Sequence, residues 1–123
     1  MRIAMWSGPR NLSTAMMYSF AQRTDCTVID EPFYAAYLAE TGLDHPMRDH
    51  ILASQPNDPR QVIANLAEPT QIPLRYEKHM THHILPEWDL SWLSDVVNVF
   101  LVRHPARVIA SYAAKRENPS IQD

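Results

Sequence analysis

Glycine and cysteine are scarce in this sequence. Two glycines, Gly8 and Gly42, and one cysteine, Cys26, occur in 123 residues. A single thiol cannot form a disulfide within the chain, which favours a cytoplasmic location. Glycine is the usual residue where the backbone approaches a ligand closely. Gly8, which ends an apolar segment, therefore marks a candidate binding loop.

A long apolar segment and an excess of basic residues are also missing. No stretch approaches the ~20 apolar residues needed to cross a membrane, and residues 3–7 are too few for the core of a signal peptide. The 11 basic and 14 acidic residues give a formal net charge of −3. Nonspecific nucleic-acid binders need the opposite balance. We therefore expect no membrane and no nucleic-acid partner, while a few local arginines can still hold a small anion.

The apolar pattern that is present is typical of an α/β domain. Strands are predicted at residues 3–7, 26–29, 74–78 and 96–102, and helices at 12–23, 33–40, 60–67 and after Pro105. Residues 43–60 are predicted as a loop with one helical turn near 47–53, and residues 84–93 as partly helical. Strands that alternate with helices predict a three-layer α/β/α fold around a parallel sheet.

Two of these predicted segments have a distinctive pattern. Residues 96–102 are apolar on both faces and are predicted to form a buried strand. In the first helix, Leu12, Met16 and Phe20 belong to a stripe with helical spacing, which predicts its buried side.

The loop from Ser7 to Thr14 joins the first strand to the first helix. Backbone N–H groups at a helix N-terminus favour an anion. Arg10 adds a forked cation, and Ser13 and Thr14 add hydroxyl donors. The loop can therefore hold a phosphate or sulfate, although an ordinary turn before a helix capped by Asn11 or Ser13 explains the same composition equally well.

The same loop differs from a nucleoside-triphosphate loop of the Walker type. That loop ends in Gly-Lys-Ser/Thr, whereas the corresponding positions here are Ser13, Thr14 and Ala15. The lysine and the hydroxyl that would bind Mg²⁺ are absent from those positions. This argues against a metal-dependent kinase or ATPase and favours an anionic donor that needs no metal.

Two further segments carry candidate acid–base groups. Glu31 follows the second predicted strand, and His79, His82 and His83 follow Lys78 at the end of the third. Ligands of open α/β sheets bind at the carboxyl ends of strands, and an imidazole or a carboxylate there can act as a general base. A surface loop or a charged helix N-terminus are the alternative interpretations. Three histidines within five residues, without a cysteine or a placed carboxylate, do not predict a metal site.

Together these segments resemble the sulfotransferases that use 3′-phosphoadenosine 5′-phosphosulfate (PAPS). Residues 9–14 are similar to the family's Pro-Lys/Arg-Ser-Gly-Thr-Thr loop, which holds the 5′-phosphosulfate, and depart from it at Asn11 and Leu12. Arg103, followed eight residues later by Ser111, is similar to the family's Arg-x-Pro pattern that binds the 3′-phosphate. Lys78 and the histidines after it resemble the Lys-x-His segment that supplies the base.

The resemblance implies a P-loop NTPase-like fold and PAPS as cosubstrate, without a metal. The sulfuryl group would pass to a hydroxyl or amine of a small-molecule acceptor. Residues 1–123 would form the N-terminal part of the domain, without the C-terminal part of the family domain. Homo-oligomerisation stays open. Two other functions also stay open: a nucleotide-dependent phosphotransferase with a degenerate loop, and a noncatalytic nucleotide-binding or assembly module.

The resemblance also implies the site residues. The predicted nucleotide-binding residues are Gly8, Pro9, Arg10, Asn11, Leu12, Ser13, Thr14, Arg103 and Ser111. The predicted catalytic residues are His79, His82, Glu31 and Arg10, with the base open among the first three.

Overall fold

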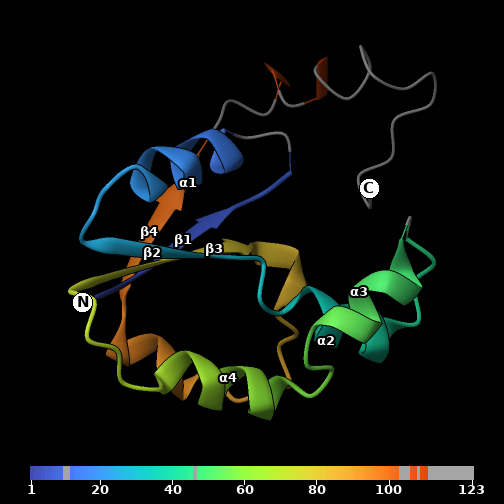
Figure 1. Ribbon diagram of the computed structural model, residues 1–123. Coiled ribbons are helices and arrows are strands. Elements are labelled where there is room, and N and C mark those ends of the chain that lie inside the picture. The colour runs from blue at the N-terminus through green and yellow to red at the C-terminus, as the bar shows by residue number, and fades with distance from the viewer. Residues whose placement is uncertain (10–11, 46, 103–105, 108, 111–123) are drawn as a thin grey trace.

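A parallel sheet forms the centre of the computed structural model, which describes residues 1–9, 12–45, 47–102, 106–107 and 109–110 (Figure 1). Its strands are β1 (Arg2–Ser7), β2 (Cys26–Asp30), β3 (Leu74–Met80) and β4 (Val97–Leu101). They are arranged in the order β2-β3-β1-β4, and every pairing is parallel. The predicted α/β fold with a parallel sheet is therefore confirmed.

Helices lie on both faces of this sheet. Figure 1 shows α1 (Ser13–Ala21) on one side and α4 (Pro59–Ala67) on the other, with α2 (Tyr34–Thr41) and α3 (Arg48–Ser54) beyond the end of β2. Along the chain, two short 3₁₀ helices, η1 (Thr81–His83) and η2 (Ser91–Asp95), follow β3 and precede β4. The predicted helical turn near residues 47–53 corresponds to α3. No helix in the described part of the chain is long and apolar enough to span a membrane.

Local sequence explains two of the helix ends. Gly42 ends α2 in the left-handed conformation, with φ 69°, which a residue without Cβ adopts most easily. Asp58 precedes Pro59 at the start of α4, and its Oδ1 accepts a hydrogen bond from the Arg60 N–H at 2.9 Å. Asp–Pro is a typical helix start because the acid caps a free N–H and proline has none to cap.

The core on the α1 face differs in part from the predicted stripe. Met17 packs with Met5 and Tyr76 in a buried cluster, and Met16 and Phe20 pack against it. Leu12, predicted to be part of this stripe, is 71% exposed. The reason is that the helix begins only at Ser13, so Leu12 lies before the first turn rather than on its inner side.

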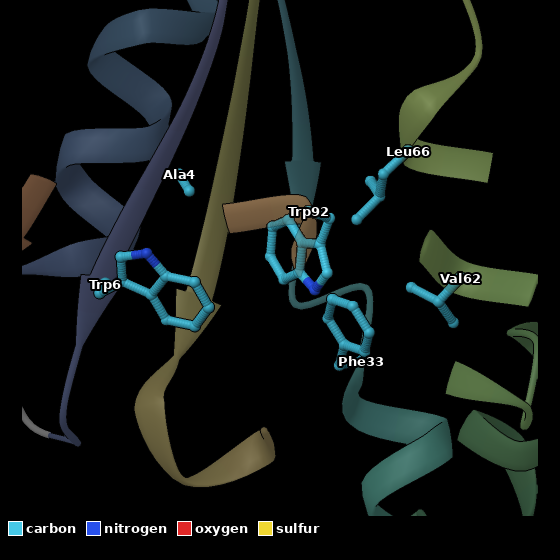
Figure 2. Close-up of a cluster of buried hydrophobic side chains, with 6 residues drawn as sticks. All are labelled: Ala4, Trp6, Phe33, Val62, Leu66 and Trp92. Atoms are coloured by element: carbon cyan, nitrogen blue, oxygen red, sulfur yellow. The ribbon is translucent and has the colours of Figure 1, made fainter. Parts of the chain in front are cut away.

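A second core lies on the α4 face, and Figure 2 shows its buried members. They are Ala4, Trp6, Phe33, Val62, Leu66 and Trp92. The Trp92 ring lies 6.0 Å from the Trp6 ring and 5.6 Å from the Phe33 ring, centroid to centroid. This aromatic cluster joins the sheet to η2 and to the segment that leads into α2.

The predicted burial of the last strand is wrong for the described structure. Val97 is 47% exposed and Phe100 is 65% exposed. Among the strands that the structure describes, β4 pairs only with β1. Its position at an edge leaves its apolar side chains accessible to solvent.

Candidate functional site

The carboxyl ends of β1, β2 and β3 lie at one edge of the sheet because the strands are parallel. Gly8 and Pro9 continue from β1 toward α1, and Glu31 follows β2 directly. Gly8 has space around it: a Cβ added there would meet no described atom within 4 Å. Packing of the described residues therefore gives no steric reason for glycine at this position, and closeness to a ligand remains a prediction.

The N-terminus of α1 has features that suit an anion. Leu12 is the residue before the first turn, and no described side chain caps the helix there. Of the two alternative caps, Asn11 or Ser13, Asn11 lies outside the described residues, and Ser13 is not the cap because it is the first helical residue. The first turn contains no acidic residue. The free N–H groups and the helix dipole thus meet no negative side chain within the helix.

Lys78 connects this helix to the end of β2. Its side chain is buried, and its Nζ lies 3.1 Å from the Thr14 Oγ1 on α1. The same Nζ lies 3.3 Å from the Asp30 Oδ1 and 3.4 Å from the Glu31 Oε2. Sequence reasoning aligned Lys78 with a family segment but did not include it among the site residues. Its pairing in register with Asp30 depends on β2 and β3 being neighbours, which spacing along the chain does not reveal.

Glu31 has an unusual backbone. Its φ is 47°, in the left-handed region that non-glycine residues rarely adopt. Two backbone–backbone hydrogen bonds hold this conformation: the Glu31 N–H donates to the Lys78 carbonyl at 2.9 Å, and the Glu31 carbonyl accepts from the Tyr34 N–H at 3.1 Å. Strained backbone of this kind costs roughly 1–3 kcal/mol and is found preferentially at functional sites.

The Glu31 carboxyl is also electrostatically perturbed. Desolvation by burial raises its pKa, the Lys78 ammonium opposes that shift, and the neighbouring Asp30 carboxylate adds to it. A carboxyl with a raised pKa is a stronger base when it is ionised.

His79 lies on the opposite face of the sheet from Lys78, since successive side chains of a strand alternate. It is 1% exposed, and its Nε2 lies 3.0 Å from the Glu77 Oε1. Its ring stacks on Trp6 with centroids 4.5 Å apart. Arg2 Nε donates to the other Glu77 oxygen at 2.8 Å. Although desolvation opposes the change, hydrogen bonds from His79 and Arg2 lower the pKa of Glu77. His79 is therefore part of a buried hydrogen-bonded network with Glu77 and Arg2.

His82 and His83 lie in η1. His82 is exposed, and desolvation by its neighbours, followed by the nearby His45, lowers its pKa. His83 is buried against the Tyr34 ring of α2. The three histidines thus lie in different surroundings. His79 belongs to a buried network, His82 is exposed, and His83 packs against an aromatic ring.

Four predicted site residues lie outside the described residues. They are Arg10, Asn11, Arg103 and Ser111. Among the predicted site residues that the structure describes, Thr14 and Glu31 both contact Lys78, and Ser13 precedes Thr14 at the start of α1. In the described part of the chain, no group of three or more His, Cys, Asp or Glu side chains is arranged to hold a metal ion.

Comparison with known proteins places this chain in a family. Two relatives from Arabidopsis thaliana, branched-chain-amino-acid aminotransferase-like proteins 2 and 1, are 38% and 37% identical over 111 residues. These alignments cover 89% of this chain but 20% of each relative, so the chain spans about a fifth of their length. No solved structure matches. The sulfotransferase domain family matches residues 1–123, the whole length given, and the chain therefore belongs to that family.

Proposed function

We propose that this chain binds PAPS and takes part in transfer of its sulfuryl group to a hydroxyl or amine of a small-molecule acceptor. One observation carries the proposal. A buried ammonium, that of Lys78, bridges a hydroxyl at the N-terminus of α1 and a carboxylate with a raised pKa. Transfer of an anionic group needs these three elements together: a donor-rich cradle, a cation and a base.

The cradle would hold the phosphosulfate end of PAPS. The N-terminal N–H groups of α1, with Ser13 and Thr14, offer donors to it, and Lys78 offers a cation beside Thr14. Arg10 is predicted to contribute a second cation. Arg103 and Ser111 are predicted to hold the 3′-phosphate.

We assign the base to Glu31 rather than to His79 or His82. The Nε2 of His79 is occupied by Glu77 and its ring is enclosed, and His82 is exposed. Glu31 is partly buried and in contact with Lys78, which also contacts the cradle. A base must reach the proton that it removes, so proximity to the cradle decides among the three candidates.

In this scheme the Glu31 carboxylate removes the acceptor's proton. The acceptor oxygen or nitrogen forms a bond to sulfur while the bond from sulfur to the bridging oxygen of the 5′-phosphate breaks. The electron pair of that bond leaves with adenosine 3′,5′-bisphosphate, and the proton on Glu31 passes to water. Lys78 stabilises the negative charge that develops on the bridging oxygen as its bond to sulfur breaks.

Calorimetry with adenosine 3′,5′-bisphosphate tests the binding step. The wild-type protein should bind it, and Lys78→Met should weaken binding about tenfold or more, as loss of a charged hydrogen bond does. Thr14→Val is a second variant in case Lys78→Met does not fold. Arg60→Ala removes an exposed cation of α4 and serves as the control, with unchanged affinity expected.

Three results would contradict the proposal or part of it. Absence of binding by the wild-type protein, or equal binding by Lys78→Met and Thr14→Val, would overturn the nucleotide site. Tighter binding of ATP with Mg²⁺ would favour the phosphotransferase. Binding of the bisphosphate together with no transfer from PAPS by the whole protein would favour a noncatalytic module.

A further inference from the structure

Five rings pack together where α2 meets η1. Tyr34 stacks on His83 with centroids 4.6 Å apart and planes 9° apart, and Tyr37 lies 5.1 Å from the same imidazole. His82 and His45 complete the group: the His82 ring lies 5.5 Å from Tyr37, and the Tyr34 hydroxyl lies 2.9 Å from the His45 Nδ1. The group joins the first turn of α2 to η1, which follows β3 directly.

His83 is the buried centre of this group. It is 3% exposed, and its Nδ1 has no hydrogen-bond partner among the described residues. Desolvation, helped by the nearby His82, His45, His79 and Lys78, lowers its pKa to about 3, so the ring is neutral at physiological pH. The contacts that His83 makes with Tyr34 and Tyr37 are those of its flat, neutral ring.

The ring contact leads directly to the backbone of Glu31. Tyr34, the stacking partner, donates its N–H to the Glu31 carbonyl, and the Glu31 N–H donates to the Lys78 carbonyl. A strained residue keeps its conformation only where its surroundings hold it. Displacement of Tyr34 would remove one of the two backbone bonds that hold Glu31 next to the Lys78 ammonium.

We propose that His83 is a positioning residue: its buried ring fixes Tyr34, and through Tyr34 it holds Glu31 against Lys78. The consequence for catalysis depends on the proposed function, in which Glu31 is the base. The positioning itself is a property of the fold and can be measured without any substrate.

Hydrogen exchange of the whole protein tests the positioning. His83→Ala should speed exchange of the Glu31, Tyr34 and Tyr37 amides about tenfold or more, because local opening becomes easier. His83→Phe, which keeps a flat ring without the nitrogens, should restore exchange to within about twofold of the wild type. Control variants are His50→Ala, an exposed histidine of α3, and Val62→Ala, a core change in α4. Neither should accelerate these three amides selectively.

A carboxyl titration followed by NMR gives a second measurement. If His83 holds Glu31 in its desolvated position, His83→Ala should lower the Glu31 pKa toward its ordinary value, and His83→Phe should not. Unchanged exchange in His83→Ala, or equal acceleration in His83→Phe, would overturn the proposal. Should His83→Ala fail to fold, Tyr34→Leu removes the same stack from its other side, and unchanged Glu31 exchange there would also overturn it.

Binding of adenosine 3′,5′-bisphosphate separates this proposal from the proposed function. Affinity in His83→Ala should stay within about threefold of the wild type, because the cradle at α1 is not part of the ring group. A wild-type protein that does not bind the bisphosphate would overturn the nucleotide site, while the exchange result would still decide the role of His83.

Discussion

In strands β3 and β4, polarity and burial are the reverse of the usual pattern: the polar strand is buried and the apolar strand is exposed. Strand β3 has the polar sequence Arg-Tyr-Glu-Lys-His at residues 75–79, and all of these residues except Arg75 are buried. Strand β4, with the sequence VNVFL, carries no charge, yet most of it is exposed. The difference lies in position: β3 has β2 and β1 as neighbours, while the described part of the sheet gives β4 only β1.

The comparison shows what makes buried charge tolerable in this fold. The buried Glu77 and Lys78 of β3 each have a partner: Glu77 has Arg2 and His79, and Lys78 has Glu31. Unpaired, such groups would cost several kcal/mol each. The two sets point to opposite faces of the sheet. One therefore stabilises the interior, while the other lies at the candidate transfer site.

The largest effect is expected from breaking the interior set. Glu77→Ala leaves the Arg2 guanidinium without its buried partner, and removing one member of such a pair typically costs ~3–5 kcal/mol. Urea denaturation of the two proteins measures the difference in the free energy of unfolding. Asp25→Ala breaks the exposed Arg23–Asp25 pair and should leave the midpoint unchanged. A small loss in Glu77→Ala would mean that the charges of β3 are hydrated.

A pH effect of intermediate size is expected from His83. Its folded pKa is about 3, below the usual value near 6.5, so below pH 6.5 the unfolded chain binds a proton that the folded protein does not. Above pH 6.5 the ring is neutral in both states, and the contribution of His83 to the free energy of unfolding has its full value. It should fall by ~1 kcal/mol per pH unit between pH 6 and pH 4 as the unfolded state protonates.

Denaturation of the wild type and of His83→Phe across this range measures the contribution. Between pH 6 and pH 4, the free energy of unfolding of His83→Phe should fall by ~1 kcal/mol per pH unit less than that of the wild type. Equal slopes in the two proteins would show that His83 is hydrated and titrates normally, contrary to its burial.

The smallest effect is expected in β4. Val97→Thr changes an exposed side chain, and exposed substitutions away from special features usually change stability by less than ~0.5 kcal/mol. The control Val62→Thr, in the buried core under α4, should cost more because a hydroxyl is buried there. If both variants lose the same stability, β4 is covered in the protein in solution, and the contrast with β3 disappears.

Sequence reasoning predicted the fold, whereas the contacts of the candidate site are visible only in the structure. The segments predicted as strands at residues 3–7, 26–29 and 74–78 are strands in the structure, although β3 continues to Met80. The pattern of residues 96–102 predicted a strand correctly, but its burial depends on neighbours that no local pattern contains. At the site, Ser13, Thr14 and Glu31 were named from local motifs. Lys78 was not chosen, because its partners lie 47 and 64 residues away.

The sequence by itself determined the order of strands and helices, since apolar spacing and helix-end signals are local properties of the chain. It also determined which chemical groups end the strands. Only the tertiary structure decided that β2 lies beside β3, which places Lys78 between Glu31 and Thr14. It also assigned adjacent residues to different environments: alternation along β3 directs Lys78 to one face and His79 to the other. Burial and pairing arise from contacts between distant segments, and so from the folded chain alone.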